Sequence, residues 1–153
     1  MSELLNILRD SGGFSGFHRT KSISREVSDK ILYSVNFCPL SHKPDEFHYE
    51  TVWLSDFINT ITRDILKNNI VKDAKTLIVI SDKQGTFLQK NNKRDVVVSD
   101  ITLCASYMML TAVSYGLICR MFREFNRDHL RKTLGFSSEY EPIIILALGH
   151  SKR

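Results

Sequence analysis

The feature that most constrains this fold is a long apolar run in the second half of the chain. It reads SDITLCASYMMLTAVSYGLICRMF, residues 99–122, and predicts one buried helix opened by Ser99 and Asp100. Its length approaches that of a membrane span, but Ser, Thr, Tyr and Cys interrupt it, so we expect a core helix and no membrane contact. Gly116 lies near its end, where a glycine either terminates the helix or leaves room for something packed against the backbone.

Composition sets broad limits on the rest of the chain. The 153 residues fit one main domain (17–153) preceded by a short helix and glycine-rich linker (1–16). The net charge of +4 is too small to argue for nucleic acid, and it suits a phosphate-bearing ligand equally well. Three widely spaced cysteines do not form a disulfide framework, so we expect a reducing, cytoplasmic compartment. The acidic N-terminus with its early Gly-Gly is unlike a signal peptide.

The remaining segments carry local signals of helices and strands. Helical stretches combine apolar periodicity with a capping residue, and strand stretches are short runs of aromatic and β-branched residues. Their order is helix, helix, strand, helix, strand, helix, helix, strand, which predicts a layered α/β or α+β domain with helices packed on one sheet. The expected helices are Ser2–Leu8, one after Ser24, one after Ser55 or Asp56, the central run and 127–134, and the expected strands are Phe47–Leu54, Thr76–Ile80 and 143–148.

The central run also carries a specific pattern, an Asp-headed apolar helix ending in Leu-x-Ala-x-x-x-Gly-Leu. A polar helix ending in Leu134-Gly135 follows it, and the last strand leads into a glycine turn at Gly149. In this order the features resemble the nitroreductase family of FMN-dependent oxidoreductases. The residues that fall on the helix pattern without a gap are Asp100, Ala105, Leu110, Ala112, Gly116 and Leu117.

A second, weaker match lies in the loop after the second helix. The family has Ala-Pro-Ser-x-x-Asn-x-Gln-Pro-Trp-x-Phe there, and residues 38–49, CPLSHKPDEFHY, align to it without a gap. Pro39 matches, whereas Leu40, Lys43 and Asp45 replace the family's Ser, Asn and Gln. The family's opening Arg-x-Ser-x-Arg, which binds the FMN phosphate, is represented only by the segment His18-Arg19-Thr20-Lys21 at imperfect spacing.

The resemblance implies an α+β, three-layer domain, with helices packed on a mixed, mostly antiparallel sheet around a long buried central helix. It implies a homodimer with FMN at the interface, NAD(P)H as reductant, and a nitroaromatic, quinone or enone as electron acceptor in ping-pong chemistry. The flavin would carry this chemistry, so no catalytic side chain is implied. The cofactor-binding residues that the resemblance implies are Arg19, Lys21, Pro39, Lys43, Gly116, Leu117, Lys152 and Arg153.

Several alternatives stay open. Ile118 replaces the third residue of the family's Gly-Leu-Gly, and with the other altered positions this also fits a catalytically degenerate member that binds flavin or serves as a partner subunit. A nucleic-acid- or phosphate-binding module would rest on charge alone. Cys38, His42 and His48 fall short of a spaced zinc set, and Cys38 has no visible partner for a redox role. Gly116 fits plain helix termination as well, and the basic residues fit a solvated loop or tail.

Overall fold

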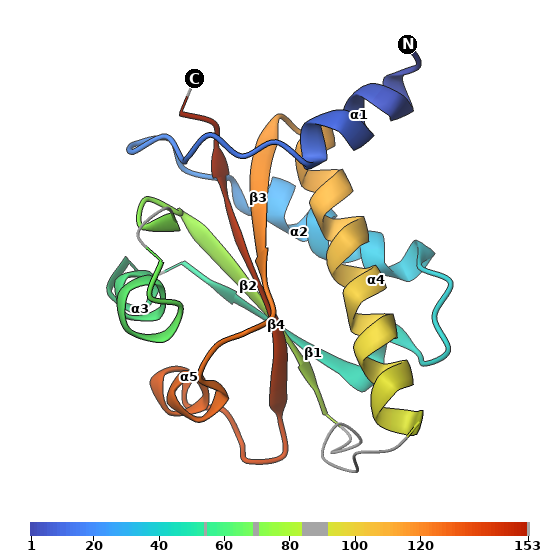
Figure 1. Ribbon diagram of the computed structural model, residues 1–153, viewed down its shortest axis with the longest axis vertical. Coiled ribbons are helices and arrows are strands. Elements are labelled where there is room, and N and C mark those ends of the chain that lie inside the picture. The colour runs from blue at the N-terminus through green and yellow to red at the C-terminus, as the bar shows by residue number, and fades with distance from the viewer. Residues whose placement is uncertain (54, 69–70, 84–91, 153) are drawn as a thin grey trace.

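The computed structural model describes residues 1–53, 55–68, 71–83 and 92–152, which form three layers (Figure 1). The strands are β1 (Phe47–Val52), β2 (Thr76–Asp82), β3 (Leu117–Phe122) and β4 (Glu141–His150), and the helices are α1 (Glu3–Ser11), α2 (Arg25–Tyr33), α3 (Ser55–Thr60), α4 (Asn92–Ser114) and α5 (Arg127–Leu134). The sheet in the middle is antiparallel throughout its described strands, in the order β1-β2-β4-β3. Helices α2 and α4 cover one face, and α3 and α5 cover the other (Figure 1). The expected three-layer α+β domain is therefore confirmed.

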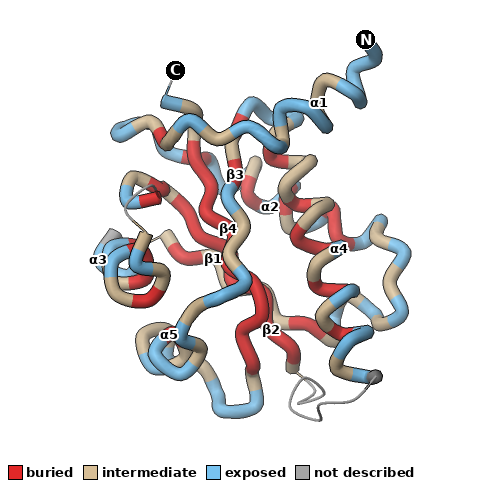
Figure 2. The backbone as a smooth tube through the Cα atoms, viewed as in Figure 1, coloured by how far each residue is buried: buried red, intermediate tan, exposed pale blue. Residues whose placement is uncertain are grey.

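The two central strands are apolar through their middle residues because both of their faces are covered. Every residue of β2 is buried, as is all of β4 except its last residue (Figure 2). Side chains then alternate between two cores: Ile78 and Ile80 pack under α4, whereas Leu77 and Val79 pack under α3 and α5. The prediction of a strand at Thr76–Ile80 buried on both faces is confirmed.

Two of the helix caps that the sequence indicated are confirmed, whereas Ser55 and Asp56, expected to cap a helix, already lie within α3. The Ser24 side chain accepts a hydrogen bond from Val27 N–H at the start of α2, and Asn126 does the same for α5. Gly135 ends α5 in the left-handed conformation. The strand expected at Phe47–Leu54 is β1, which ends at Val52, and Leu54 lies outside the described residues.

The central helix begins earlier than predicted. It starts at Asn92, so Ser99 and Asp100 do not open it but lie in its third turn. The first turn reads NKRD and is polar, so no apolar residue marks where the helix begins. Asp95 lies in the first turn, where an acidic residue interacts favourably with the helix dipole.

The central helix also ends earlier than predicted, and its expected last part is a strand. α4 stops at Ser114, and residues 117–122 form β3 at the edge of the sheet. Gly116 separates the two elements with a φ of 79°, a left-handed conformation that glycine adopts without steric cost. Beyond it the side chains alternate, with Leu117 facing α4 and Ile118 facing the opposite layer. This alternation is typical of a strand rather than of a helix.

α4 is apolar around much of its circumference, yet the sheet covers only one side of it. Ile101, Cys104 and Met108 are fully buried, whereas Val96 and Leu103 remain exposed. By length and composition alone, Lys93–Ser114 could cross a membrane, but core helices of layered domains satisfy the same criterion. Here the helix forms one layer of the domain.

α1 lies at one end of the molecule beside α4 (Figure 1). Ser2 caps it by accepting a hydrogen bond from Leu5 N–H, so the expected N-terminal helix is present and extends to Ser11. None of its described residues is buried, although Leu4, Leu5 and Leu8 are apolar (Figure 2). The division between residues 16 and 17 into two units stays a prediction.

Candidate functional site

Residues 16–18 pair with residues 150–152 at one end of the sheet. His18 N–H donates to the His150 carbonyl at 2.8 Å, and Lys152 N–H donates to the Gly16 carbonyl at 3.0 Å. The N-terminal segment thus runs antiparallel to the end of β4. We call this region, residues 16–21 with residues 149–152, the terminal junction.

The terminal junction brings together three of the predicted phosphate-binding cations. Arg19 and Lys21 lie within three residues after His18, and Lys152 lies on the paired segment. All three side chains are exposed, and none makes an ion pair with another described residue. Arg153, also predicted to bind the cofactor, lies outside the described residues. Cations without an internal partner are available to an external anion.

Gly149 makes the terminal junction possible. A Cβ atom at this position would lie 2.6 Å from Cδ1 of the Phe17 ring, which is closer than two carbon atoms approach in folded proteins. Phe17 is only 2% exposed, and its backbone forms a bridge with Ser151. Gly149 was expected in a turn, but it lies within β4 and serves the packing of Phe17.

Gly116 and Leu117 lie beside the terminal junction, because Leu117 pairs with His150 across the sheet. No described atom lies within 4 Å of the place where a Gly116 side chain would begin. The glycine is therefore required by the backbone conformation, and the space beside it is open. Leu117 is buried in the core under α4, so any contact with a ligand there would use its backbone. Ile118 packs into the opposite core, away from the face that carries Leu117.

The His18 ring shapes the turn that carries the cations. Its Nδ1 atom accepts hydrogen bonds from the backbone N–H groups of Thr20 and Lys21, both at 3.2 Å. A neutral imidazole that accepts at Nδ1 carries its proton on Nε2. Because these two N–H groups are already satisfied, an anion at the turn would be bound by side chains.

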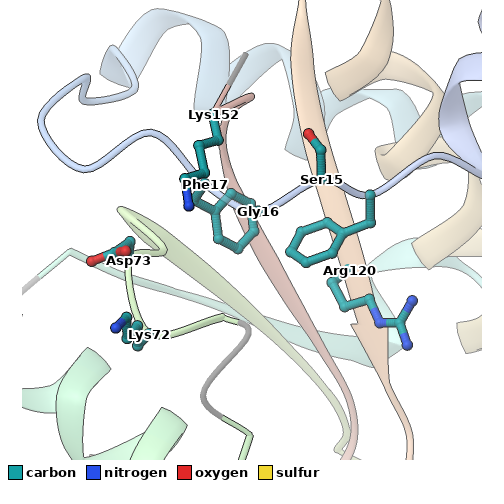
Figure 3. A pocket seen from close by; sticks show the side chains of 8 residues that line it. Ser15, Gly16, Phe17, Lys72, Asp73, Arg120 and Lys152 are labelled. Carbon is teal, nitrogen blue, oxygen red and sulfur yellow. The ribbon is translucent and has the colours of Figure 1, made fainter.

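Lys152 also lines an open cleft of about 490 Å³ (Figure 3). Its walls come from the segment Phe14–Phe17, from Lys72 and Asp73 before β2, and from Arg120 on β3. In Figure 3 Lys152 and Asp73 lie on one side of the Phe17 ring, whereas the Arg120 guanidinium points away on the other. Three cations against one carboxylate make the cleft positively charged.

A second group of predicted residues lies on the loop after α2, and Asp100 holds this loop against α4. The residue is 3% exposed. Its carboxylate accepts hydrogen bonds from Ser41 N–H at 3.2 Å, from His42 N–H at 2.8 Å and from His42 Nδ1 at 2.7 Å. A carboxylate is stable in the interior only when its oxygens are hydrogen-bonded or paired. These bonds therefore satisfy Asp100 and fix the loop at the same time.

The same loop presents Pro39 and Lys43 to solvent. Lys43 directly precedes a 3₁₀ turn, Pro44–Glu46, and Asp45 within that turn is exposed as well. Leu40, which replaces the family's serine, packs against the core under α4. Pro39 and Lys43 are thus accessible, and Leu40 is turned inward.

The loop and the terminal junction are far apart within one chain. The loop contacts α4 at Asp100, and Gly116 follows the last residue of α4, Ser114. A helix rises about 1.5 Å per residue, so these contacts are separated by about 21 Å along the axis. One chain alone does not bring all the predicted residues to a single small ligand.

Three groups of low acidity lie between the loop and α4. The Tyr49 hydroxyl donates to the Pro44 carbonyl at 3.0 Å and lies 3.8 Å from Cys104 Sγ. Burial raises the pKa of Tyr49 and raises the pKa of Cys104 to about 12. Burial also raises the pKa of Cys38. All three groups are neutral near pH 7 and supply no charge to the loop.

The sequence did not indicate several residues that the fold adds to these regions. His150 contributes the carbonyl that binds the N-terminal segment, and Lys72 and Arg120 add charge to the cleft. Long-range strand pairing brings these residues to the site, and local sequence patterns do not reveal such pairing. Among the described residues, no three His, Cys, Asp or Glu side chains are grouped as metal ligands.

Comparison with protein families matches residues 39–150 to the nitroreductase family. Among curated proteins, no match is found. Solved structures also match over nearly the whole chain. Their sequence identities to this chain are low, so these matches establish only the fold.

Three of these structures illustrate the likeness. A protein from Staphylococcus epidermidis provisionally identified as an NAD(P)H:FMN oxidoreductase has a TM-score of 0.84 at 16% identity, covering 100% of this chain and 89% of that one. A nitroreductase family protein from Clostridium novyi has a TM-score of 0.83 at 16% identity, covering 99% and 86%. An FMN-dependent nitroreductase from Clostridium difficile has a TM-score of 0.74 at 22% identity, covering 94% and 86%.

Proposed function

This chain belongs to the nitroreductase family, and we propose that it is an FMN-dependent oxidoreductase that works as a homodimer. NAD(P)H is the proposed reductant, and a nitroaromatic, quinone or enone is the proposed acceptor. When bound, FMN supplies the redox chemistry by passing a hydride equivalent from the reductant to the acceptor. We place the protein in the cytoplasm because its three cysteines are free.

The observation that carries this proposal is the terminal junction. It holds Arg19, Lys21 and Lys152, three cations without a partner among the described residues, next to the turn at Gly116. A flavin mononucleotide has an anionic phosphate and a flat ring. The cations suit the phosphate, and the open space beside Gly116 suits the close approach of a ring to backbone.

The substitutions that put flavin binding in doubt do not obstruct this region. Ile118 packs into the core under α3 and α5, and Leu40 packs into the core under α4. Neither side chain projects into the space beside Gly116. The residues present therefore fit a flavin, with the phosphate assigned to the cations and the ring to Gly116 and the backbone of Leu117.

The homodimer explains how the loop residues reach the same flavin. Their loop contacts α4 at Asp100, about 21 Å along the helix from Ser114, so we assign Pro39 and Lys43 to the flavin held by the partner subunit. Lys43 would donate a hydrogen bond to the ring. Exposed apolar side chains supply a surface for such a dimer. They lie on α1, on and after α2, and on and after α4, and include Leu4, Leu5, Leu8, Tyr33, Phe37, Val96, Leu103 and Tyr115.

Within this site the chain binds and positions, and it has no assigned acid or base. Asp100 holds the loop so that Pro39 and Lys43 keep a fixed position on α4. The neutral Tyr49 and Cys104 behind the loop add no negative charge beside a reduced flavin. These roles are consistent with chemistry carried by the cofactor.

A degenerate member of the family is the second candidate. Lys43 and Asp45 replace the two amide side chains of the family motif, and Asp45 is exposed on the same loop. A carboxylate there would oppose the build-up of negative charge on a reduced flavin. Such a protein would bind FMN without turnover, or would serve as a partner subunit.

The test is the visible absorption spectrum of the purified chain, followed by titration with FMN and then with NADH or NADPH without oxygen. We expect one FMN per chain and bleaching of the flavin bands by one of the nucleotides. Binding without bleaching would favour the degenerate member, and a colourless protein that ignores FMN would overturn flavin function. Sedimentation of the same sample should show two chains, and a monomer that retains FMN would contradict the shared site.

A further inference from the structure

His42 and the buried Asp100 form a histidine–carboxylate pair between the loop and α4. Asp100 Oδ2 lies 2.7 Å from His42 Nδ1 and accepts the backbone N–H of the same residue at 2.8 Å. Because an ionised carboxylate only accepts hydrogen bonds, the ring donates from Nδ1, and the neutral ring carries its proton there. A histidine held in this way has a fixed tautomer and a fixed orientation.

The other ring nitrogen of His42, Nε2, is left for an external partner. Within the described part of the chain it makes no hydrogen bond. The His42 side chain is 25% exposed, so solvent reaches the ring. The Phe47 ring packs against it, with 5.8 Å between the ring centroids. His42 is therefore a positioned acid–base group with one nitrogen to offer.

The proposed function leaves one proton unassigned. A nitro, quinone or enone acceptor that receives a hydride equivalent gains negative charge on an oxygen, and that oxygen must then be protonated. A general acid supplies such a proton from a side chain within hydrogen-bond reach. His42 directly precedes Lys43, on the loop that the proposed dimer brings to the partner subunit's flavin.

We propose that His42 is the proton donor for the electron acceptor and that Asp100 is its positioning residue. This inference rests on the proposed function and assigns one further step of it. A quinone takes up the hydride equivalent and one proton from His42 Nε2, and leaves as a hydroquinone. The imidazolium becomes a neutral imidazole that still donates from Nδ1 to Asp100, and water returns the proton to Nε2. Over one cycle NAD(P)H, one proton and one quinone give NAD(P)⁺ and one hydroquinone.

The charges around the ring suit a proton donor. Asp100 on α4 gives the imidazolium a buried counter-charge. From β1 the ring faces Phe47, which carries no charge. Lys43 and Asp45 lie on the same loop, but both are exposed, so solvent and salt screen their charges. Asp100 is therefore the charge that acts most directly on His42.

The experiment follows the two halves of the reaction by stopped-flow absorbance. FMN-loaded protein is reduced by one equivalent of NAD(P)H without oxygen, then mixed with menadione, a quinone, or with ferricyanide, which accepts electrons without a proton. The variant is His42→Asn, because its amide can still donate to Asp100 from about the place of Nδ1 but has no group at Nε2. We expect reoxidation by menadione to be about 100-fold slower than in wild type. Reduction by NAD(P)H and reoxidation by ferricyanide should be unchanged.

His48→Asn is the matched control. His48 on β1 also pairs with a carboxylate, with 3.2 Å between its Nε2 and Glu50 Oε2, and its side chain is 26% exposed. Because it lies outside the loop, its loss should leave both reoxidation rates unchanged.

The outcomes separate this inference from the proposed function. Reoxidation of His42→Asn by menadione at the wild-type rate, or an equal slowing with ferricyanide, would overturn the role of His42 while flavin function stands. A wild-type chain that binds no FMN, or whose FMN is not bleached by NAD(P)H, would overturn the proposed function and this inference with it.

The tautomer of His42 provides a test that needs neither flavin nor a folded variant. Long-range ¹⁵N–¹H NMR of the labelled chain distinguishes Nδ1–H from Nε2–H in each of its five histidines. We expect neutral His42 to carry its proton on Nδ1 in the wild type, and to lose this preference in Asp100→Ala. A loss of stability alone would not change the tautomer. A neutral wild-type His42 with its proton on Nε2 would overturn the pairing with Asp100 and the proposal.

Discussion

The loop end of α4 and its Gly116 end are organised in opposite ways. At the loop end, the chain itself supplies every partner that the buried Asp100 carboxylate needs. At the other end, Arg19, Lys21 and Lys152 are exposed and have no partner among the described residues. The first region is complete in the isolated chain, whereas the second gains its counter-charge only from a ligand. Substitutions at the first should therefore change stability, and substitutions at the second should change binding.

The largest effect is expected at Asp100. Asp100→Ala removes the acceptor of the Ser41 and His42 N–H groups and should cost about 3 kcal/mol of unfolding free energy, because two donors lose a charged acceptor. Asp100→Asn is the matched control, since it keeps one carbonyl acceptor and should lose about half as much. Denaturant unfolding gives the free energies, and amide hydrogen exchange reports on the two donors. Unchanged protection of both amides in Asp100→Ala would show that other contacts hold the loop.

The next effect is expected at Gly149. Gly149→Ala places a Cβ against the buried Phe17 ring at 2.6 Å and should destabilise the chain by about 2 kcal/mol, because the ring must leave its packed position. Gly13→Ala is the control, since its nearest described contact would be an ordinary 3.5 Å. Thermal unfolding of both variants measures the difference. Equal stabilities would mean that the N-terminal segment does not depend on Phe17 packing, and would weaken the terminal junction as a preformed site.

A third substitution should change FMN binding without changing stability. Arg19→Ala should weaken FMN binding about tenfold, or about 1.4 kcal/mol, because a charge-assisted contact to the phosphate is lost. The unfolding free energy in the absence of ligand should stay within about 0.5 kcal/mol of wild type, because the side chain is exposed. Fluorescence titration with FMN measures the affinity.

The control for this variant is Arg123→Ala. Arg123 is also exposed, and it follows the far end of β3, about 20 Å along the strand from Leu117. Its loss should leave FMN affinity unchanged. Riboflavin, which lacks the phosphate, should bind wild type and Arg19→Ala equally. A tenfold loss with riboflavin as well would assign Arg19 to the ring or to the fold instead of the phosphate.

Local chemistry explains which parts of the fold the sequence predicts. The strand Thr76–Ile80 and the caps Ser24 and Asn126 depend on residues close together in the chain, and all are confirmed. Residues 117–122 were assigned to the wrong element because a continuous apolar run does not distinguish a helix from a strand that follows it. The only local signal was Gly116, whose position near the end of the run fitted either assignment.

The candidate regions depend on distant pairing and are predicted less completely. The resemblance indicated Arg19 and Lys152 separately, but only the pairing of residues 16–18 with 150–152 explains why they lie together. Asp100 was taken as a helix-opening residue, whereas its role is to bind a loop about 60 residues earlier in the chain. Burial and long-range hydrogen bonds of this kind have no periodic signature in a sequence.

The smallest effect, at Gly116, separates a conformational role from a ligand contact. Gly116→Ala forces an alanine into a φ of 79° and should cost about 1 kcal/mol of unfolding free energy. Gly135→Ala is a closely matched control, because Gly135 also has a positive φ, 68°, and no described atom within 4 Å of its would-be Cβ. It lies at the end of α5, away from the terminal junction. The two variants should therefore lose equal stability.

FMN affinity then distinguishes the two glycines. If a flavin ring packs against the turn after α4, the added methyl group of Gly116→Ala occupies part of its space, and FMN should bind several-fold more weakly than to Gly135→Ala. If both variants bind FMN as wild type does, Gly116 is needed only to turn the chain from α4 into β3. The flavin ring would then lie elsewhere, and the assignment of Gly116 and Leu117 to the ring would be wrong. The assignment of the phosphate to the cations of the terminal junction would not be affected.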